Sequence, residues 1–211
     1  MKYGESAFDI IYLLFGLICG IYILMNRRNK AGMLMGIAVL VLAGGDAFHL
    51  IPRVLNYFVE SGFSTALGLG KAVTSVTMTV FYVLLFHVWQ RAYKKKASRT
   101  VRLAVYALAA IRIILCLFPQ NGWFENESSM AWGIIRNVPF VLLGILIIIL
   151  FYIKRARINC LRWMWLLITL SFLFYIPVAV FAGIVPMLGM LPKTVCYMIM
   201  IYNFVQYVRG K

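Results

Sequence analysis

Residues Met130 to Ile153 read MAWGIIRNVPFVLLGILIIILFYI, and Lys154, Arg155 and Arg157 follow them closely. An apolar stretch of about 20 residues is long enough for a helix to cross the hydrocarbon core of a bilayer. Basic residues that flank such a stretch mark its cytoplasmic end. This stretch is therefore predicted to be a transmembrane helix that ends at the cytoplasmic surface.

Six more stretches of similar length and hydrophobicity predict six further spans. We expect one seven-helix transmembrane domain over residues 1–211, an all-α integral membrane fold, with Pro52 to Leu69 as its longest outer loop. The predicted spans cover Ala7–Met25, Ala31–Ile51, Gly70–Trp89, Val101–Phe118, Met130–Ile153, Trp163–Gly183 and Leu188–Val208.

The composition supports a membrane protein, because 64% of the residues are apolar, 13% are charged and the mean hydropathy is +0.90. These values exclude an ordinary soluble domain and a disordered chain. The net charge of +15 does not indicate a nucleic-acid partner, since the lysines and arginines form short clusters between apolar runs.

Most of the 21 lysines and arginines fall on one side of the predicted bundle. The positive-inside rule then places the N-terminus outside and the C-terminus in the cytoplasm of a multi-pass protein of the cell membrane. The cations on this side are Arg27, Arg28, Lys30, Arg91, Lys94, Lys95, Lys96, Arg99, Arg102, Lys154, Arg155, Arg157, Arg162, Arg209 and Lys211.

Two pairs of glycines have the small-xxx-small spacing of closely packed membrane helices. They are Gly16 with Gly20 in the first predicted span and Gly32 with Gly36 in the second. Both pairs are expected to form close helix contacts.

Four ionisable residues lie inside the predicted spans, at nearly the same depth below the outer surface. Arg112, Arg136, Lys193 and Asp46 are each roughly 8–9 Å from the outer ends of their helices. A charge in hydrocarbon costs about 2.5–3.5 kcal/mol or more, so these groups are expected to face the bundle interior and to find partners.

The charges at this level do not balance. Asp46 can neutralise one cation, and Glu60 can reach in from the outer loop to neutralise another, which leaves a surplus of positive charge. We infer an outward-facing, water-filled cavity that binds an anionic, amphiphilic ligand such as a membrane lipid or another small anion. Its candidate binding residues are Arg53, Lys71, Arg112, Arg136 and Lys193.

Two alternatives to this cavity remain open. The charges can form an ion network that only orders the helices, and the arginines can extend to the headgroups. Extension to the headgroups is the simpler interpretation for Arg53 and Lys71, which lie at helix ends.

Asp46, His49 and Arg53 share one helix face, being three and four residues apart. A carboxylate beside an imidazole can set up a general base, although such a pair can equally be structural. No metal or cofactor is expected. The only other histidine, His87, lies on the order of 20 Å away along antiparallel helices, and zinc needs ligands about 2 Å from the ion.

The chain resembles the lysoplasmalogenase-like (YhhN) family of polytopic membrane hydrolases at three places. These are the Gly45-Asp46 pair, the segment Phe81 to His87 and the segment Tyr202 to Gln206. The resemblance implies that Asp46 acts on the vinyl ether of a lysolipid. That family has eight segments and a late Ser-Asp motif, whereas Ser171 is followed here by Phe172.

Two functions of different classes follow from the sequence. The first is a receptor or transporter that recognises an anion without altering it. The second is a membrane-embedded lipid hydrolase that uses Asp46 and His49.

Overall fold

The computed structural model describes the backbone of residues 2–59, 62–125, 129–180 and 186–210, and it omits the side chains of residues 2 and 176–189. In these ranges the chain forms seven α-helices and two short 3-10 helices, with no strand. The α-helices are α1 (Lys2–Met25), α2 (Lys30–Phe58), α3 (Ser64–Ala92), α4 (Arg99–Leu117), α5 (Met130–Ile153), α6 (Met164–Val180) and α7 (Pro186–Arg209), and the 3-10 helices are η1 (Pro119–Asn121) and η2 (Asn159–Leu161).

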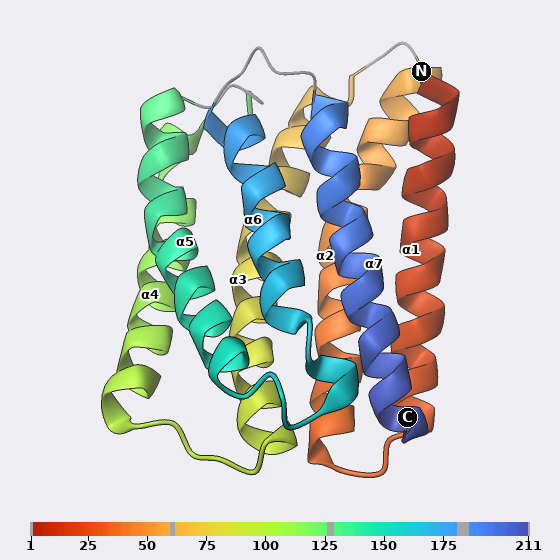
Figure 1. Ribbon diagram of the computed structural model, residues 1–211. Helices are drawn as coiled ribbons and strands as arrows, with labels where there is room; N and C mark the ends of the chain where they lie inside the picture. Colours follow the sequence, from red (N-terminus) through yellow and green to blue (C-terminus); the bar gives the residue numbers. More distant parts are fainter. Residues whose placement is uncertain (1, 60–61, 126–128, 181–185, 211) are drawn as a thin grey trace.

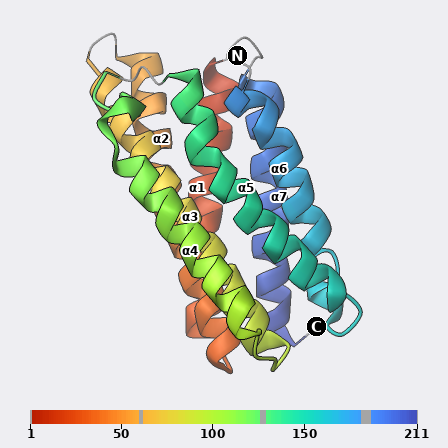
Figure 2. The ribbon, with the colours of Figure 1, turned by 90° about the vertical axis from the view of Figure 1, so that its left-hand side faces the viewer.

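The helices form a closed ring in which each one packs against its neighbours in the sequence. Contacts between α1 and α7 close the ring, and α3 also contacts α5 while α2 contacts α7. Figure 1 and Figure 2 show the helices side by side with roughly parallel axes, and successive helices run in opposite directions. Helix α1 begins at one end of the bundle and α7 ends at the other.

The structure is that of a helical membrane protein. Each predicted span overlaps one of the seven α-helices, and α1 to α5 are long and apolar enough to cross a bilayer. The last three residues of the predicted span Trp163–Gly183 lie outside the described residues. The described part of α6, together with η2, is a shorter apolar segment. Large apolar side chains cover the outside of the bundle, as expected where lipid is the solvent, including Ile18, Leu103, Ile114, Ile149 and Leu173.

The prediction of an outer loop over Pro52 to Leu69 is wrong. Helix α2 continues through Pro52 to Phe58, and α3 begins at Ser64, so the helices are longer than their apolar cores. The last turns of α2 are held by polar contacts with α1, described below, which hydropathy does not register. The connection between the two helices is correspondingly short.

Small residues bring α1 and α2 together, as the glycine spacing predicts. A Cβ atom on Gly16 would lie 2.7 Å from the Cβ of Ala43, and one on Gly20 would lie 2.6 Å from Leu40. Gly36 likewise faces the side chain of Leu24 across the same interface, so three of the four glycines form close contacts. The fourth, Gly32, has only ordinary van der Waals neighbours.

Helices α2 and α3 approach even more closely at the end of the bundle where α1 begins. A Cβ on Gly70 of α3 would overlap the carbonyl oxygen of Phe48 and would lie 2.8 Å from the Cα of His49. Close by, Thr74 Oγ1 donates a 2.9 Å hydrogen bond to the carbonyl of Gly45. Because backbone faces backbone, this contact fixes the height of α2 relative to α3.

Replacing Gly70 by alanine tests this contact. The added methyl group has no space, so we expect Gly70→Ala to destabilise the purified protein by about 1–3 kcal/mol. Thermal unfolding in detergent measures the effect. Gly44→Ala is the matched control, because a Cβ at that position meets nothing within 4 Å. Equal melting temperatures for the two variants would contradict the described packing.

Candidate functional site

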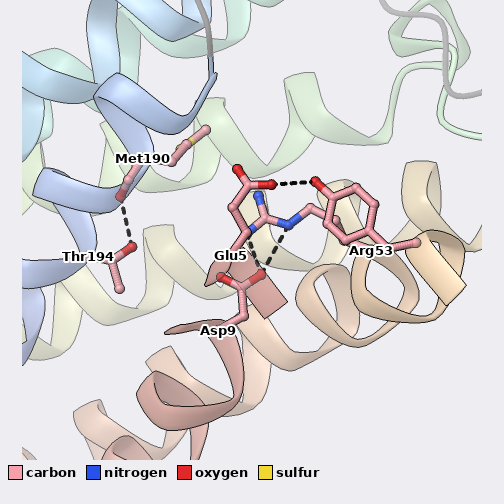
Figure 3. Close-up of polar contacts among 6 residues, drawn as sticks. Glu5, Asp9, Arg53, Met190 and Thr194 are labelled. Carbon is pink, nitrogen blue, oxygen red and sulfur yellow. Dashed lines mark hydrogen bonds and ion pairs between the residues drawn. The ribbon is translucent and has the colours of Figure 1, made fainter. Parts of the chain in front are cut away.

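Two polar contacts join the first turns of α1 to the last turns of α2. Arg53 donates from Nε and Nη2 to Asp9 Oδ2, at 3.2 and 2.5 Å, and Tyr57 donates its hydroxyl to Glu5 at 2.8 Å. Figure 3 shows both contacts, with Met190 and Thr194 of α7 nearby. The Arg53 charge is therefore neutralised by Asp9, a residue on the neighbouring helix and only 4% exposed.

Asp46 lies deeper along the same interface. Its Oδ2 accepts a 2.7 Å hydrogen bond from the hydroxyl of Tyr12 on α1, and its strongest charged neighbour is Lys193 on α7. The Nδ1 atom of His49 forms no hydrogen bond with the Asp46 carboxylate, because it is buried without a hydrogen-bond partner among the described residues. The cations around His49 are Arg53, Lys71 and Lys193.

Lys193 is held by aromatic rings. Its Nζ lies 4.9 Å from the ring centroid of Tyr175 on α6 and 5.6 Å from that of Tyr197, one turn along α7. The negative face of an aromatic ring attracts an ammonium group in this arrangement. Lys193 forms no ion pair with Asp46, since the only ion pair within 4 Å among the described residues joins Arg53 and Asp9.

Arg112 is the largest fully buried side chain of the described structure, at 2% exposure. Its Nη1 donates to Asn137 Oδ1 at 2.8 Å and to the carbonyl of Arg136 at 3.1 Å. The guanidinium lies over the Phe140 ring, 3.8 Å from the centroid. Its Nε is buried and has no partner. All the groups that hold this cation are therefore neutral.

Arg136 is also held by neutral groups. Its Nη1 donates to Asn121 Oδ1 at 2.8 Å, and the guanidinium lies 4.4 Å from the ring centroid of Trp123. Asn121 and Trp123 in turn donate to main-chain carbonyls at the end of α4, including that of Cys116. Arg136 is thus tied to the connection between α4 and α5.

Tyr175 links the two halves of the group of polar residues described above, which we call the polar layer. The layer consists of Asp9, Tyr12, Asp46, Arg53, Arg112, Asn121, Arg136, Asn137, Tyr175 and Lys193. The Tyr175 hydroxyl donates to Asn137 Oδ1 at 3.1 Å, while its ring faces Lys193. Since Asn137 also accepts from Arg112, a chain of contacts runs from Lys193 through Tyr175 and Asn137 to Arg112. We call these four residues the polar chain.

The structure connects Arg112, Arg136 and Lys193 through Asn137 and Tyr175, but it pairs the predicted residues differently from the expectation. Neither Arg112 nor Arg136 forms an ion pair with Asp46 among the described residues, and the Arg112 side chain is buried within the bundle. Glu60, the second expected partner, lies outside the described residues. Lys71 is exposed at the start of α3, with Arg136 as a charged neighbour.

Several residues of this layer were missed by sequence analysis. Asp9 is an acid three residues inside the first predicted span, and its position alone could have indicated a partner for Arg53. Asn137, beside Arg136, is a second polar residue in the most apolar span. Nothing in the sequence singles out Tyr12, Asn121 and Tyr175 as partners of the charged residues, because tyrosines and loop asparagines are common in membrane proteins.

The described residues contain no group of three or more His, Cys, Asp or Glu side chains arranged to hold a metal ion. The polar layer instead offers hydrogen-bond donors. These are the positively charged guanidinium and ammonium groups and the neutral tyrosine hydroxyl groups. Such donors suit an oxyanion.

The role of Asn137 can be tested by removing its oxygen. Asn137→Leu removes the oxygen that accepts hydrogen bonds from both Arg112 and Tyr175. A hydrogen bond to a buried charge contributes about 1.5–3 kcal/mol to stability. We expect a loss of at least about 2 kcal/mol in thermal unfolding. Asn203→Leu on α7 is the control, since its half-buried side chain makes no hydrogen bond among the described residues. A smaller loss for Asn137→Leu than for the control would refute this role.

Comparison of the chain with protein-family models, with curated proteins and with solved structures finds no match in any of the three.

Proposed function

We propose that this protein crosses the cell membrane seven times, with its N-terminus outside, and binds the anionic headgroup of an amphiphile at the polar layer. Arg112, Arg136 and Lys193 would hold the headgroup, and Lys71 would face it from the outer end of α3. Binding without chemical change makes the protein a receptor or a transporter.

The arrangement of the chain supports this topology. The basic connections α1–α2, α3–α4 and α5–α6 lie at the end of the bundle where α7 finishes (Figure 1). An odd number of crossings would put the start of α1 on the opposite side. The polar layer would then lie in the outer half of the membrane.

One observation carries the proposed binding function: buried Arg112 has only neutral partners. A desolvated cation normally acquires a carboxylate, because uncompensated charge in a membrane interior is costly. Here amide oxygen, carbonyl oxygen and the Phe140 ring replace the carboxylate, and the buried Nε donor remains unused. An oxyanion that reaches the Nε edge would supply the missing charge and the missing acceptor together.

The geometry favours binding over lipid hydrolysis. A hydrolase of the lysoplasmalogenase type would use Asp46 to orient or activate a base. In the described structure Asp46 accepts from Tyr12, and Nδ1 of His49 has no partner. A hydrolase role for Asp46 stays a prediction from resemblance, and lysolipid hydrolysis by the purified protein would support it instead.

The proposed topology predicts opposite labelling of two exposed positions. Gln120→Cys, beyond the end of α4, should react with a membrane-impermeant thiol reagent on intact cells, whereas Lys95→Cys, between α3 and α4, should not. The background protein lacks Cys19, Cys116, Cys160 and Cys196. Permeabilised cells provide the positive control for Lys95→Cys. Labelling of Lys95→Cys on intact cells would refute the proposed orientation.

The proposed site predicts which arginines matter for binding. Protein in phosphatidylcholine nanodiscs is titrated with decanoate, decyl phosphate and decanesulfonate, with decyltrimethylammonium as the control for tail binding. Arg112→Gln and Arg136→Gln should weaken anion binding about tenfold or more, equivalent to about 1.4 kcal/mol. Arg53→Gln should weaken it less than about threefold, because Asp9 already neutralises Arg53.

A reciprocal variant separates ligand binding from a purely structural role. Asn137→Asp places a carboxylate beside Arg112, so the empty protein should gain thermal stability and lose its stabilisation by the anionic amphiphiles. If all four variants bind the three anions as the wild type does, the charged layer only orders the helices and the proposed function is wrong.

A further inference from the structure

Four cations meet at the end of the bundle where α7 finishes. They come from two distant parts of the chain, which are the connection between α1 and α2 with the first residue of α2, and the last residue of α7. The packing of α7 against α1 and α2 brings these parts together (Figure 1). We call the four exposed residues the basic patch; they are Arg27, Arg28, Lys30 and Arg209.

Close contacts hold the two parts of the basic patch against each other. A Cβ atom on Gly32, in the first turn of α2, would lie 3.4 Å from Val208 of α7 and 3.5 Å from the Cβ of Arg27. A Cβ atom on Gly210, directly after α7, would lie 3.7 Å from Nη1 of Arg28. The basic residues of the α1–α2 connection therefore lie beside the end of α7.

Neutral groups orient two arginines of the basic patch. Arg209 donates from Nε to the hydroxyl of Tyr22 on α1 at 3.2 Å, and its guanidinium lies 5.3 Å from the centroid of that ring. Arg27 donates from Nη1 to the carbonyl of Leu24 at 2.8 Å. A hydroxyl, a ring and a carbonyl position these side chains but leave their positive charge in place.

No acidic side chain accompanies the basic patch. The sequence has none between Asp9 and Asp46 and none after Glu127, and the ion pair of the described residues lies at the other end of the bundle. The positive-inside rule accounts for an excess of basic residues at one end of a membrane protein. It does not account for cations from two distant parts of the chain that meet at one place and are oriented there by neutral groups.

Exposed apolar side chains continue from the basic patch along the outside of α1 and α7, which pack side by side. They include Ile18, Ile21 and Met25 of α1 and Ile199 and Tyr202 of α7. The surface thus combines positive charge at the end of the bundle with an apolar face along the helices. A phospholipid has the complementary pair of features, since its phosphate lies at the membrane surface and its acyl chains lie along the helices.

We propose that the basic patch binds the headgroup of an anionic phospholipid, whose acyl chains lie along α1 and α7. Guanidinium groups pair with phosphate oxygens through parallel hydrogen bonds, and basic clusters at the end of a membrane helix attract anionic lipids. A zwitterionic lipid fits less well, because no acidic side chain receives its ammonium group. The headgroup would touch the α1–α2 connection and α7 together, and so would stabilise the closed ring. This site is separate from the polar layer and independent of the binding function proposed for it.

Native mass spectrometry of the full chain in detergent tests the proposal by measuring the Kd of the first bound lipid. Dioleoyl phosphatidylglycerol is the probe, and dioleoyl phosphatidylcholine is the control with the same acyl chains. We expect phosphatidylglycerol to bind about tenfold more tightly or better, and to raise the melting temperature more. The triple variant Arg27→Gln/Arg28→Gln/Arg209→Gln should weaken phosphatidylglycerol binding about tenfold or more and leave phosphatidylcholine binding unchanged.

A second triple variant is the matched control for charge. Lys94→Gln/Lys95→Gln/Lys96→Gln removes three exposed cations from the α3–α4 connection and should weaken binding less than about threefold.

Tyr22→Phe keeps every charge but removes the hydroxyl that orients Arg209, so it should weaken phosphatidylglycerol binding about threefold. If the arginine triple variant does not fold, Arg28→Gln alone should show a smaller loss in the same direction.

Equal losses in the two triple variants would overturn the proposal, because overall charge alone would then govern binding. Equal affinities of the wild type for the two lipids would also overturn it. Inorganic phosphate and a hexaglutamate peptide test the other occupants of a basic surface. If either raises the melting temperature as much as phosphatidylglycerol does, the patch binds a free oxyanion or an acidic protein segment instead of a lipid. None of these outcomes alters the function proposed for the polar layer.

Discussion

The backbone contact between α2 and α3 at Gly70 is the constraint on which the rest of the polar layer depends. Because Gly70 lies against the main chain of Phe48 and His49, the two longest helices cannot slide along each other. Asp46 and His49 on α2 therefore have a fixed height relative to Lys71 on α3. Helix α1 is then aligned with α2 by its own glycines, and α7 packs against both α1 and α2. The height of Lys193 follows from that packing.

The bundle stabilises intramembrane cations in two distinct ways. Near the end of the bundle where α1 begins, Arg53 receives an ordinary carboxylate partner in Asp9. Deeper in the layer, Arg112, Arg136 and Lys193 lie against aromatic rings, and the arginines donate to amide oxygens. Rings and amides reduce the cost of burying a cation without cancelling its charge. In the binding function proposed above, the charge that the rings and amides leave uncancelled is what attracts the anionic headgroup.

The sequence predicted the seven helices well, because they follow from hydropathy. It failed at the ends of α2 and α3, where Pro52 and Arg53 suggested a loop. Polar contacts such as Tyr57 with Glu5 continue the helix there, and those depend on which helices are neighbours. The partners of each charge were unpredictable for the same reason. Asp46 meets Tyr12 of α1, its neighbour in the sequence, rather than an arginine, and only the closure of the ring brings α7 beside α2.

The closed ring has a consequence for how such a bundle can be enlarged. Helices α1 and α7 are packed side by side, yet α1 starts at one end of the bundle and α7 ends at the other (Figure 1). A second copy joined directly after α7 would therefore begin on the wrong face and would have to insert upside down. Two copies in the same orientation would need an additional crossing segment between them. Joining the start of α1 to the end of α7 in a permuted chain would require the same extra helix, despite the contact between the two.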